Sequence, residues 1–175
     1  MDDVTKIAEA VQEVIKTVAA ARVDWGSLLS GIGLIVMVAL SGIGSAIGTS
    51  IGGSAVVGMI KKKPEAFGSG LPLAAMPATQ GLYGFVGFII YNGALKNLAG
   101  HITPYQGAIV LAAGATLGLT ALISAIQQGK VVANGIAAIG SGHNVFGPTL
   151  ILGAFPEFYA ILALVAAILI KTLIV

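Results

Sequence analysis

The sequence predicts an all-α membrane protein whose four transmembrane helices form two tandem parallel hairpin repeats. Composition is the first indication: 57% of the 175 residues are hydrophobic and 9% are charged, whereas soluble domains carry about 25% charged residues. The second is a set of four apolar stretches, each at or above the roughly 20 residues that cross a bilayer. The third is a repeat of the pattern after 79 residues.

The first 24 residues predict an amphipathic N-terminal helix, residues 1–24. Apolar residues recur at alternating spacings of three and four between charged ones, at Val4, Ile7, Val11, Val14 and Val18, which is the pattern of one helix face. Two interpretations stay open: a helix or frayed tail at the membrane interface, or a stripe that meets its own copies in an oligomer.

Two hairpins follow, at residues 25–98 and 99–175. The predicted spans are residues 26–60, about 67–95, 104–140, and a fourth that ends near Lys171. The first and third exceed the length needed to cross, so they should tilt or project from the membrane.

Charge predicts the orientation. The cluster Lys61–Lys63 favours a cytoplasmic first loop by the positive-inside rule, with both termini on the other side of a cell membrane that the chain crosses several times. Lys6, Lys16 and Arg22 argue weakly for the reverse. The nine basic residues are too scattered for a nucleic-acid surface, and the absence of cysteine excludes disulfides and thiolate metal sites.

The repeat relates the two hairpins without a gap. It aligns Ser45-Ala46-Ile47 with Ser124-Ala125-Ile126, and Pro77 with Pro156. Equivalent points are separated by an even number of spans, so both hairpins run in the same direction. At this shift Glu157 aligns with Ala78; only the second hairpin, with no carboxylate in the first, carries an acid.

Glu157 is the residue around which the functional prediction is built. It is the only acidic residue after Glu65, and it lies inside the apolar run 150–170. An ionised side chain at mid-bilayer costs roughly 3 kcal/mol or more, so an intramembrane acid indicates a functional site.

Depth predicts the partners of Glu157. At 1.5 Å of rise per residue, Glu157, Gln80 and Gln128 each lie roughly 15–18 Å from the presumed cytoplasmic ends of their helices. Met76 and Tyr83 flank Gln80 at helical spacing, and Thr79 lies beside it.

These side chains suit a hard cation, because amide, hydroxyl and carboxylate oxygens can replace its hydration shell. The alternative is that Gln80, Thr79 and Gln128 only join helices by hydrogen bonds. Pro77 and Pro156 should bend their helices or leave carbonyl oxygens, those of Leu73 and Leu152, without donors.

Two further features bear on the site and its surroundings. Lys130 follows Gln128 by two residues, or about 200° of helix rotation, so it should point away from the site. Gly44, Gly48 and Gly52 form a stripe that suits either the crowded interior of an oligomeric ring or helix packing within one chain. No nucleotide, hydrolase or metalloprotease motif is present, so a non-catalytic protein is expected.

Three segments carry a resemblance to a known family: Pro77-Ala78-Thr79-Gln80-Gly81-Leu82-Tyr83-Gly84-Phe85, Gln128-Gly129-Lys130-Val131 and Glu157-Phe158-Tyr159-Ala160-Ile161-Leu162. With them, residues 26–175 resemble the duplicated proteolipid (c or K) subunit of V-type and archaeal-type rotary ATPases, especially the sodium-translocating bacterial form. The N-terminal extension of about 24 residues departs from that pattern.

The resemblance implies a homo-oligomeric rotor ring in lipid, turned as a separate soluble head hydrolyses ATP. Its implied partners are a central-stalk subunit on the cytoplasmic face and a stator membrane subunit that supplies half-channels and a cation.

The resemblance also implies roles. Glu157 would be the ion-binding carboxylate, with Thr79, Gln80 and Gln128 as side-chain Na⁺ ligands. Met76 would supply a backbone carbonyl, and Tyr83 would hydrogen-bond the carboxylate. Alternatives are a proton (H⁺) rotor of the same family and, from a different class, a four-helix ion channel or pore.

Overall fold

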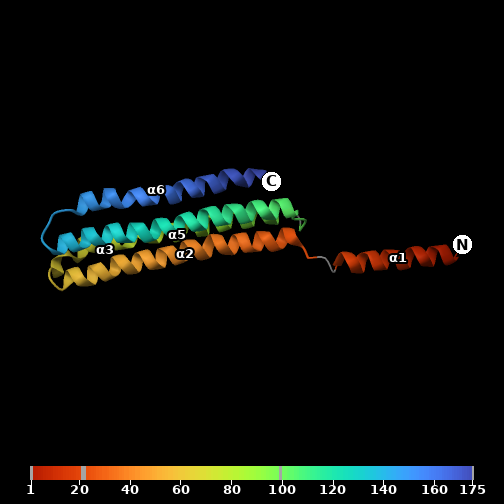
Figure 1. Ribbon diagram of the computed structural model, residues 1–175, viewed down its shortest axis with the longest axis horizontal. Helices are drawn as coiled ribbons and strands as arrows, with labels where there is room; N and C mark the ends of the chain where they lie inside the picture. The colour runs from red at the N-terminus through yellow and green to blue at the C-terminus, as the bar shows by residue number, and fades with distance from the viewer. Residues whose placement is uncertain (1, 21–22, 99, 175) are drawn as a thin grey trace.

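The structure is a computed structural model that describes residues 2–20, 23–98 and 100–174. Within these residues it is entirely helical (Figure 1). The elements are α1 (Asp2–Ala20), α2 (Trp25–Ile60), η1 (Pro64–Ala66), α3 (Phe67–Ala75), η2 (Met76–Ala78), α4 (Thr79–Lys96), α5 (Pro104–Gly140), α6 (Phe146–Ile170) and η3 (Lys171–Leu173).

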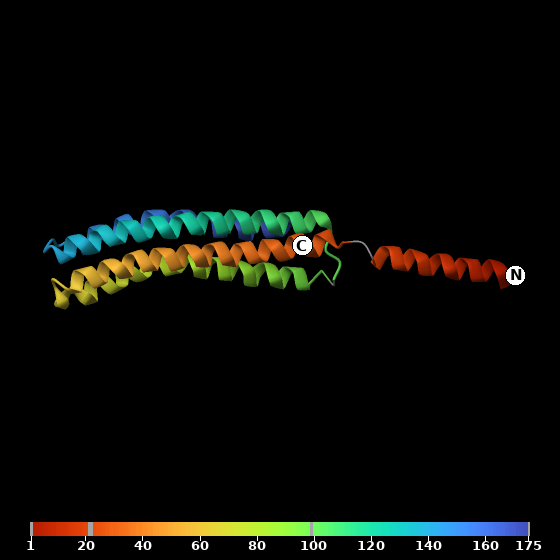
Figure 2. The ribbon, with the colours of Figure 1, turned by 60° about the horizontal axis from the view of Figure 1, so that its bottom comes forward.

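Four segments of the described chain are long and apolar enough to cross a membrane, namely Trp25–Ile60, Pro64–Lys96, Pro104–Gly140 and Phe146–Leu173. They lie side by side, and Figure 2 shows the hairpin of α2 and α4 next to that of α5 and α6. This arrangement confirms the predicted fold class of four membrane helices in two tandem hairpins.

The long helices α2 and α5 begin at capped residues. The side chain of Asp24 accepts a 3.1 Å hydrogen bond from the backbone N–H of Ser27, and hydrogen bonding to Ser27 holds the pKa of Asp24 below its ordinary value of 3.8. At the start of α5, Thr103 and Gln106 exchange side-chain to backbone bonds of 2.9 and 3.2 Å in a capping box. Such caps satisfy N–H groups that the first helical turn leaves without partners.

Glycines bring α2 and α5 into backbone contact. A Cβ atom on Gly44 would lie 2.6 Å from the Cα atom of Leu122, and one on Gly129 would lie 2.6 Å from the carbonyl oxygen of Gly48. Gly52 instead faces Ala74 of α3. The glycine stripe therefore serves packing within one chain, the second of the two sequence interpretations.

The second span is interrupted at Pro77, unlike the fourth. Proline has no N–H, and here the turn tightens into η2, so that the N–H of Met76 donates to the carbonyl of Leu73. The expectation that the Leu73 carbonyl would lack a donor was therefore wrong. In α6, the helix continues through Pro156, and side chains from α5 donate to the Pro156 and Gly153 carbonyls.

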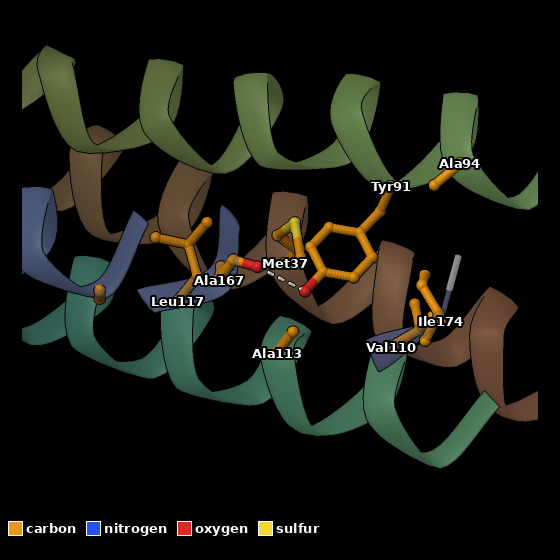
Figure 3. Close-up of a cluster of buried hydrophobic side chains, with 9 residues drawn as sticks. Met37, Tyr91, Ala94, Val110, Ala113, Leu117, Ala167 and Ile174 are labelled. Carbon is orange, nitrogen blue, oxygen red and sulfur yellow. Dashed lines mark hydrogen bonds between the residues drawn. The ribbon is translucent and has the colours of Figure 1, made fainter. Parts of the chain in front are cut away.

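A buried cluster locks the two hairpins together at the end where α2 begins (Figure 3). Met37, Leu117 and Tyr91 are fully buried in it. The Tyr91 hydroxyl donates a 2.6 Å hydrogen bond to the carbonyl oxygen of Ala167 on α6. This bond satisfies a polar group that would be costly to leave unpaired in an apolar environment.

Helix α1 lies beyond the end of the bundle at which α2 begins (Figure 1). Its apolar residues Val4, Ile7, Val11, Val14 and Val18 are between 51% and 74% exposed. The apolar face of α1 is thus open in a single chain.

Candidate functional site

Glu157 lies at the contact between the two hairpins, on α6. Its Oε1 atom accepts a 2.6 Å hydrogen bond from the Tyr83 hydroxyl of α4, and its Oε2 atom accepts a 3.1 Å bond from Nε2 of Gln128 on α5. Both bonds favour the ionised carboxylate, because an ionised carboxylate only accepts hydrogen bonds. The carboxylate is partly buried.

Two fully buried glutamines stand behind the carboxylate. Nε2 of Gln80 donates to Oε1 of Gln128 at 2.8 Å and to the Ser124 hydroxyl at 3.1 Å. Nε2 of Gln128 also donates to the carbonyl of Gly153 at 2.9 Å. The donors of both amides are used, which fixes the side-chain oxygens of the pair in place.

The η2 turn supplies further oxygens. The Thr79 hydroxyl lies 3.0 Å from the carbonyl oxygen of Met76 and 3.3 Å from Oε1 of Gln80. Ca²⁺, a hard cation of similar size to Na⁺, binds oxygens at about 2.3–2.6 Å, so neighbouring ligands at right angles stand roughly 3.3–3.7 Å apart. Small adjustments would let these three oxygens surround one such ion.

The structure brings all the sequence-predicted site residues into one hydrogen-bonded network, made of Met76, Thr79, Gln80, Tyr83, Gln128 and Glu157. Lys130 is exposed and outside the hydrogen bonds of this network, as its rotation on α5 predicted.

Sequence reasoning missed two members of the network, Ser124 and the Gly153 carbonyl. Ser124 accepts from Gln80 and donates a 2.7 Å bond to the carbonyl of Pro156. A signal for Ser124 was available, because it precedes Gln128 by four residues and so lies on the same helix face. A carbonyl such as that of Gly153 leaves no trace in the residue type.

The family described as the ATP synthase C subunit matches the chain twice, at residues 32–91 and 111–170. Both ends of the second match lie 79 residues after those of the first, which is the spacing of the repeat found in the sequence. Each match spans most of one hairpin.

Similar proteins carry related names. The chain is 37% identical over 145 residues to the V-type sodium ATPase subunit K of Enterococcus hirae, covering 82% of this chain and 90% of that protein. It is 34% identical over 142 residues to the A-type ATP synthase subunit K of Methanocaldococcus jannaschii, covering 81% of this chain but 61% of that protein. It is 22% identical over 149 residues to the 16 kDa proteolipid of the human V-type proton ATPase, covering 85% and 94%. The chain belongs to the ATP synthase C-subunit family, with two copies of the family's hairpin in one polypeptide.

Proposed function

We propose that this chain is the rotor-ring proteolipid subunit of a V-type or A-type ATPase and that it carries Na⁺ across the membrane at Glu157. The observation that supports this most directly is the closed network around the single intramembrane carboxylate. ATP hydrolysis would take place on other subunits, and this chain would supply the ion site.

Charge favours a monovalent cation. The candidate ligands are one carboxylate and neutral oxygens from Thr79, Gln80, Gln128 and Met76, so a bound Na⁺ leaves the site neutral. A divalent ion would leave one uncompensated positive charge in an apolar environment, which is costly. The Tyr83 donor favours an ionised carboxylate over a protonated one. The similarity to a relative named as part of a sodium ATPase points the same way, whereas a proton rotor remains the nearest alternative.

Neutrality suggests how rotation carries ions. An occupied site can face lipid, because no net charge is exposed. An empty site leaves Glu157 ionised, so it must meet a cation on a neighbouring stator subunit. Moving one charge across 100 mV costs about 2.3 kcal/mol, and a site near mid-bilayer therefore needs two half-channels, one to each side, in that stator.

The proposed arrangement places the Lys61–Lys63 loop on the cytoplasmic side, where a central-stalk subunit would contact the ring. Residues 1–24 would then project on the opposite side, before the two hairpins 25–98 and 99–175.

The test is protection of Glu157 by Na⁺. A carbodiimide reacts with the carboxyl group of Glu157 in purified rings at fixed pH, and millimolar Na⁺ should slow that reaction while K⁺ at equal ionic strength should not. Glu157→Gln is the control that should remove the labelling altogether. Labelling that depends on pH but not on Na⁺ would indicate the proton rotor instead. Ion conductance through the purified protein alone would indicate a channel.

A further inference from the structure

The two hairpins are equivalent residue by residue in the structure. Adding 79 to the bounds of α2 gives 104–139, against Pro104–Gly140 for α5, and adding 79 to the first residue of α3 gives the first residue of α6. The capping residues Asp24 and Thr103 are related by the same shift. Any contact that one hairpin makes can therefore be transferred to the other.

The contact between α2 and α5 within the chain is called here the inner seam. Along it, Gly44 faces Leu122 and Leu40 faces Gly118: a Cβ atom on Gly44 would lie 2.6 Å from the Leu122 Cα atom, and one on Gly118 would lie 3.2 Å from the Leu40 Cβ atom.

The equivalents of both sides of the inner seam are uncovered. Ile123 and Leu119, the equivalents of Gly44 and Leu40, are 56% and 53% exposed on α5. Ile43, the equivalent of Leu122, is 50% exposed on α2, and Ala39, the equivalent of Gly118, is exposed too. Each chain thus carries the two halves of a second seam, and neither half is in contact within one chain.

One half forms a groove between α5 and α6. The groove has a volume of about 600 Å³ and is lined by Leu119 and Ile123 of α5 together with Phe155 and Tyr159 of α6. The equivalent of Tyr159 in the first hairpin is Gln80, which is fully buried against the second hairpin. The groove is therefore the counterpart of the surface on which the second hairpin packs.

We propose that this groove binds helix α2 of a second copy of the chain, with Ile43 of that copy against Ile123 and Ala39 against Leu119. The proposal rests on the ring proposed above and assigns the residues that join its subunits. Because each chain has one groove and one matching row on α2, the contact is head to tail, which closes a ring when the rotation allows.

The joint differs from the inner seam in two ways. Isoleucines replace the Gly44 and Leu122 contact, so α2 and α5 should stand further apart between copies than within one. At the position equivalent to the ion site, one copy would offer Phe158 and Tyr159 and the next Thr49 and Ala78. This set has no carboxylate, so the joint should bind no Na⁺.

Cysteine cross-linking tests the proposal, because the native chain contains no cysteine. The double variant Ile43→Cys/Ile123→Cys, in membranes that contain the assembled protein, should form a ladder of covalent multimers on oxidation or with a short thiol-reactive linker. The matched control is Ile43→Cys/Ile161→Cys. Ile161 and its equivalent Leu82 are 37% and 61% exposed, so neither repeat covers this line, and the control should stay largely monomeric.

A second pair guards against misfolding of the first: Ala39→Cys/Leu119→Cys transfers the contact of Leu40 with Gly118 and should give the same ladder. Monomers from both pairs, in rings whose Glu157 still reacts with carbodiimide and is protected by Na⁺, would overturn the joint and leave the proposed function standing. Equal multimer yields from the control and the test pairs would also overturn it. Multimers from the test pairs without protection by Na⁺ would support the joint and contradict the ion assignment.

Discussion

Replacing Tyr83 by phenylalanine removes one hydrogen bond from the carboxylate and little else. The bond from the Tyr83 hydroxyl to Glu157 is 2.6 Å long, and hydrogen bonds to charged groups contribute about 1.5–3 kcal/mol. At about 1.4 kcal/mol per factor of ten, Na⁺ binding should weaken roughly 10- to 150-fold. The hydroxyl orients and stabilises the ionised carboxylate that the cation needs.

The assay is the Na⁺ concentration that gives half-maximal protection of Glu157 from carbodiimide at constant pH. Tyr91→Phe is the matched control, since it makes the same change on the same helix, and its hydroxyl also donates a 2.6 Å bond, to Ala167. That variant should lower thermal stability but leave half-protection unchanged. A Tyr83→Phe ring that assembles and is half-protected at the native Na⁺ concentration would refute the role given to this bond.

Three other changes test the packing and the helix ends. Ser124→Ala leaves a buried amide and a carbonyl without their partners, so thermal unfolding should show a loss of about 1–3 kcal/mol. Gly44→Ala places a methyl group 2.6 Å from the backbone of α5 and should cost about 1–3 kcal/mol, whereas Gly58→Ala on the same helix meets nothing within 4 Å and should not destabilise; equal unfolding temperatures would contradict the inner seam. Hydrogen bonds from Ser27 lower the pKa of Asp24 from 3.8, so its stabilising effect is present at neutral pH and is lost as pH falls below that value. The difference in unfolding temperature between native protein and Asp24→Ala should therefore shrink at pH 3, and a difference that is constant with pH would contradict the cap.

The sequence predicted the spans and most of the site for a physical reason. Lipid tolerates few polar groups, so Gln80, Gln128 and Glu157 stood out against an apolar background, and counting residues from the loops placed them at one depth. The rotation of Lys130 away from the site followed from helix geometry alone.

Other features could not be predicted because they depend on how helices meet. The Gly153 carbonyl is identical in the sequence to any other backbone carbonyl. Pro77 and Pro156 align in the repeat, yet only Pro77 gives a 3₁₀ turn. Side chains of α5 that reach the Pro156 turn belong to the tertiary structure. Likewise, the partner of the glycine stripe became clear only when α5 was placed against α2.

The pairing of Glu157 with Ala78 sets a gear ratio for the proposed rotor. With one carrier for every two hairpins, a ring of given circumference delivers half as many ions per revolution as one in which each hairpin holds an acid. The same turn of the shaft is then divided among fewer ions, so each can be driven against a steeper gradient.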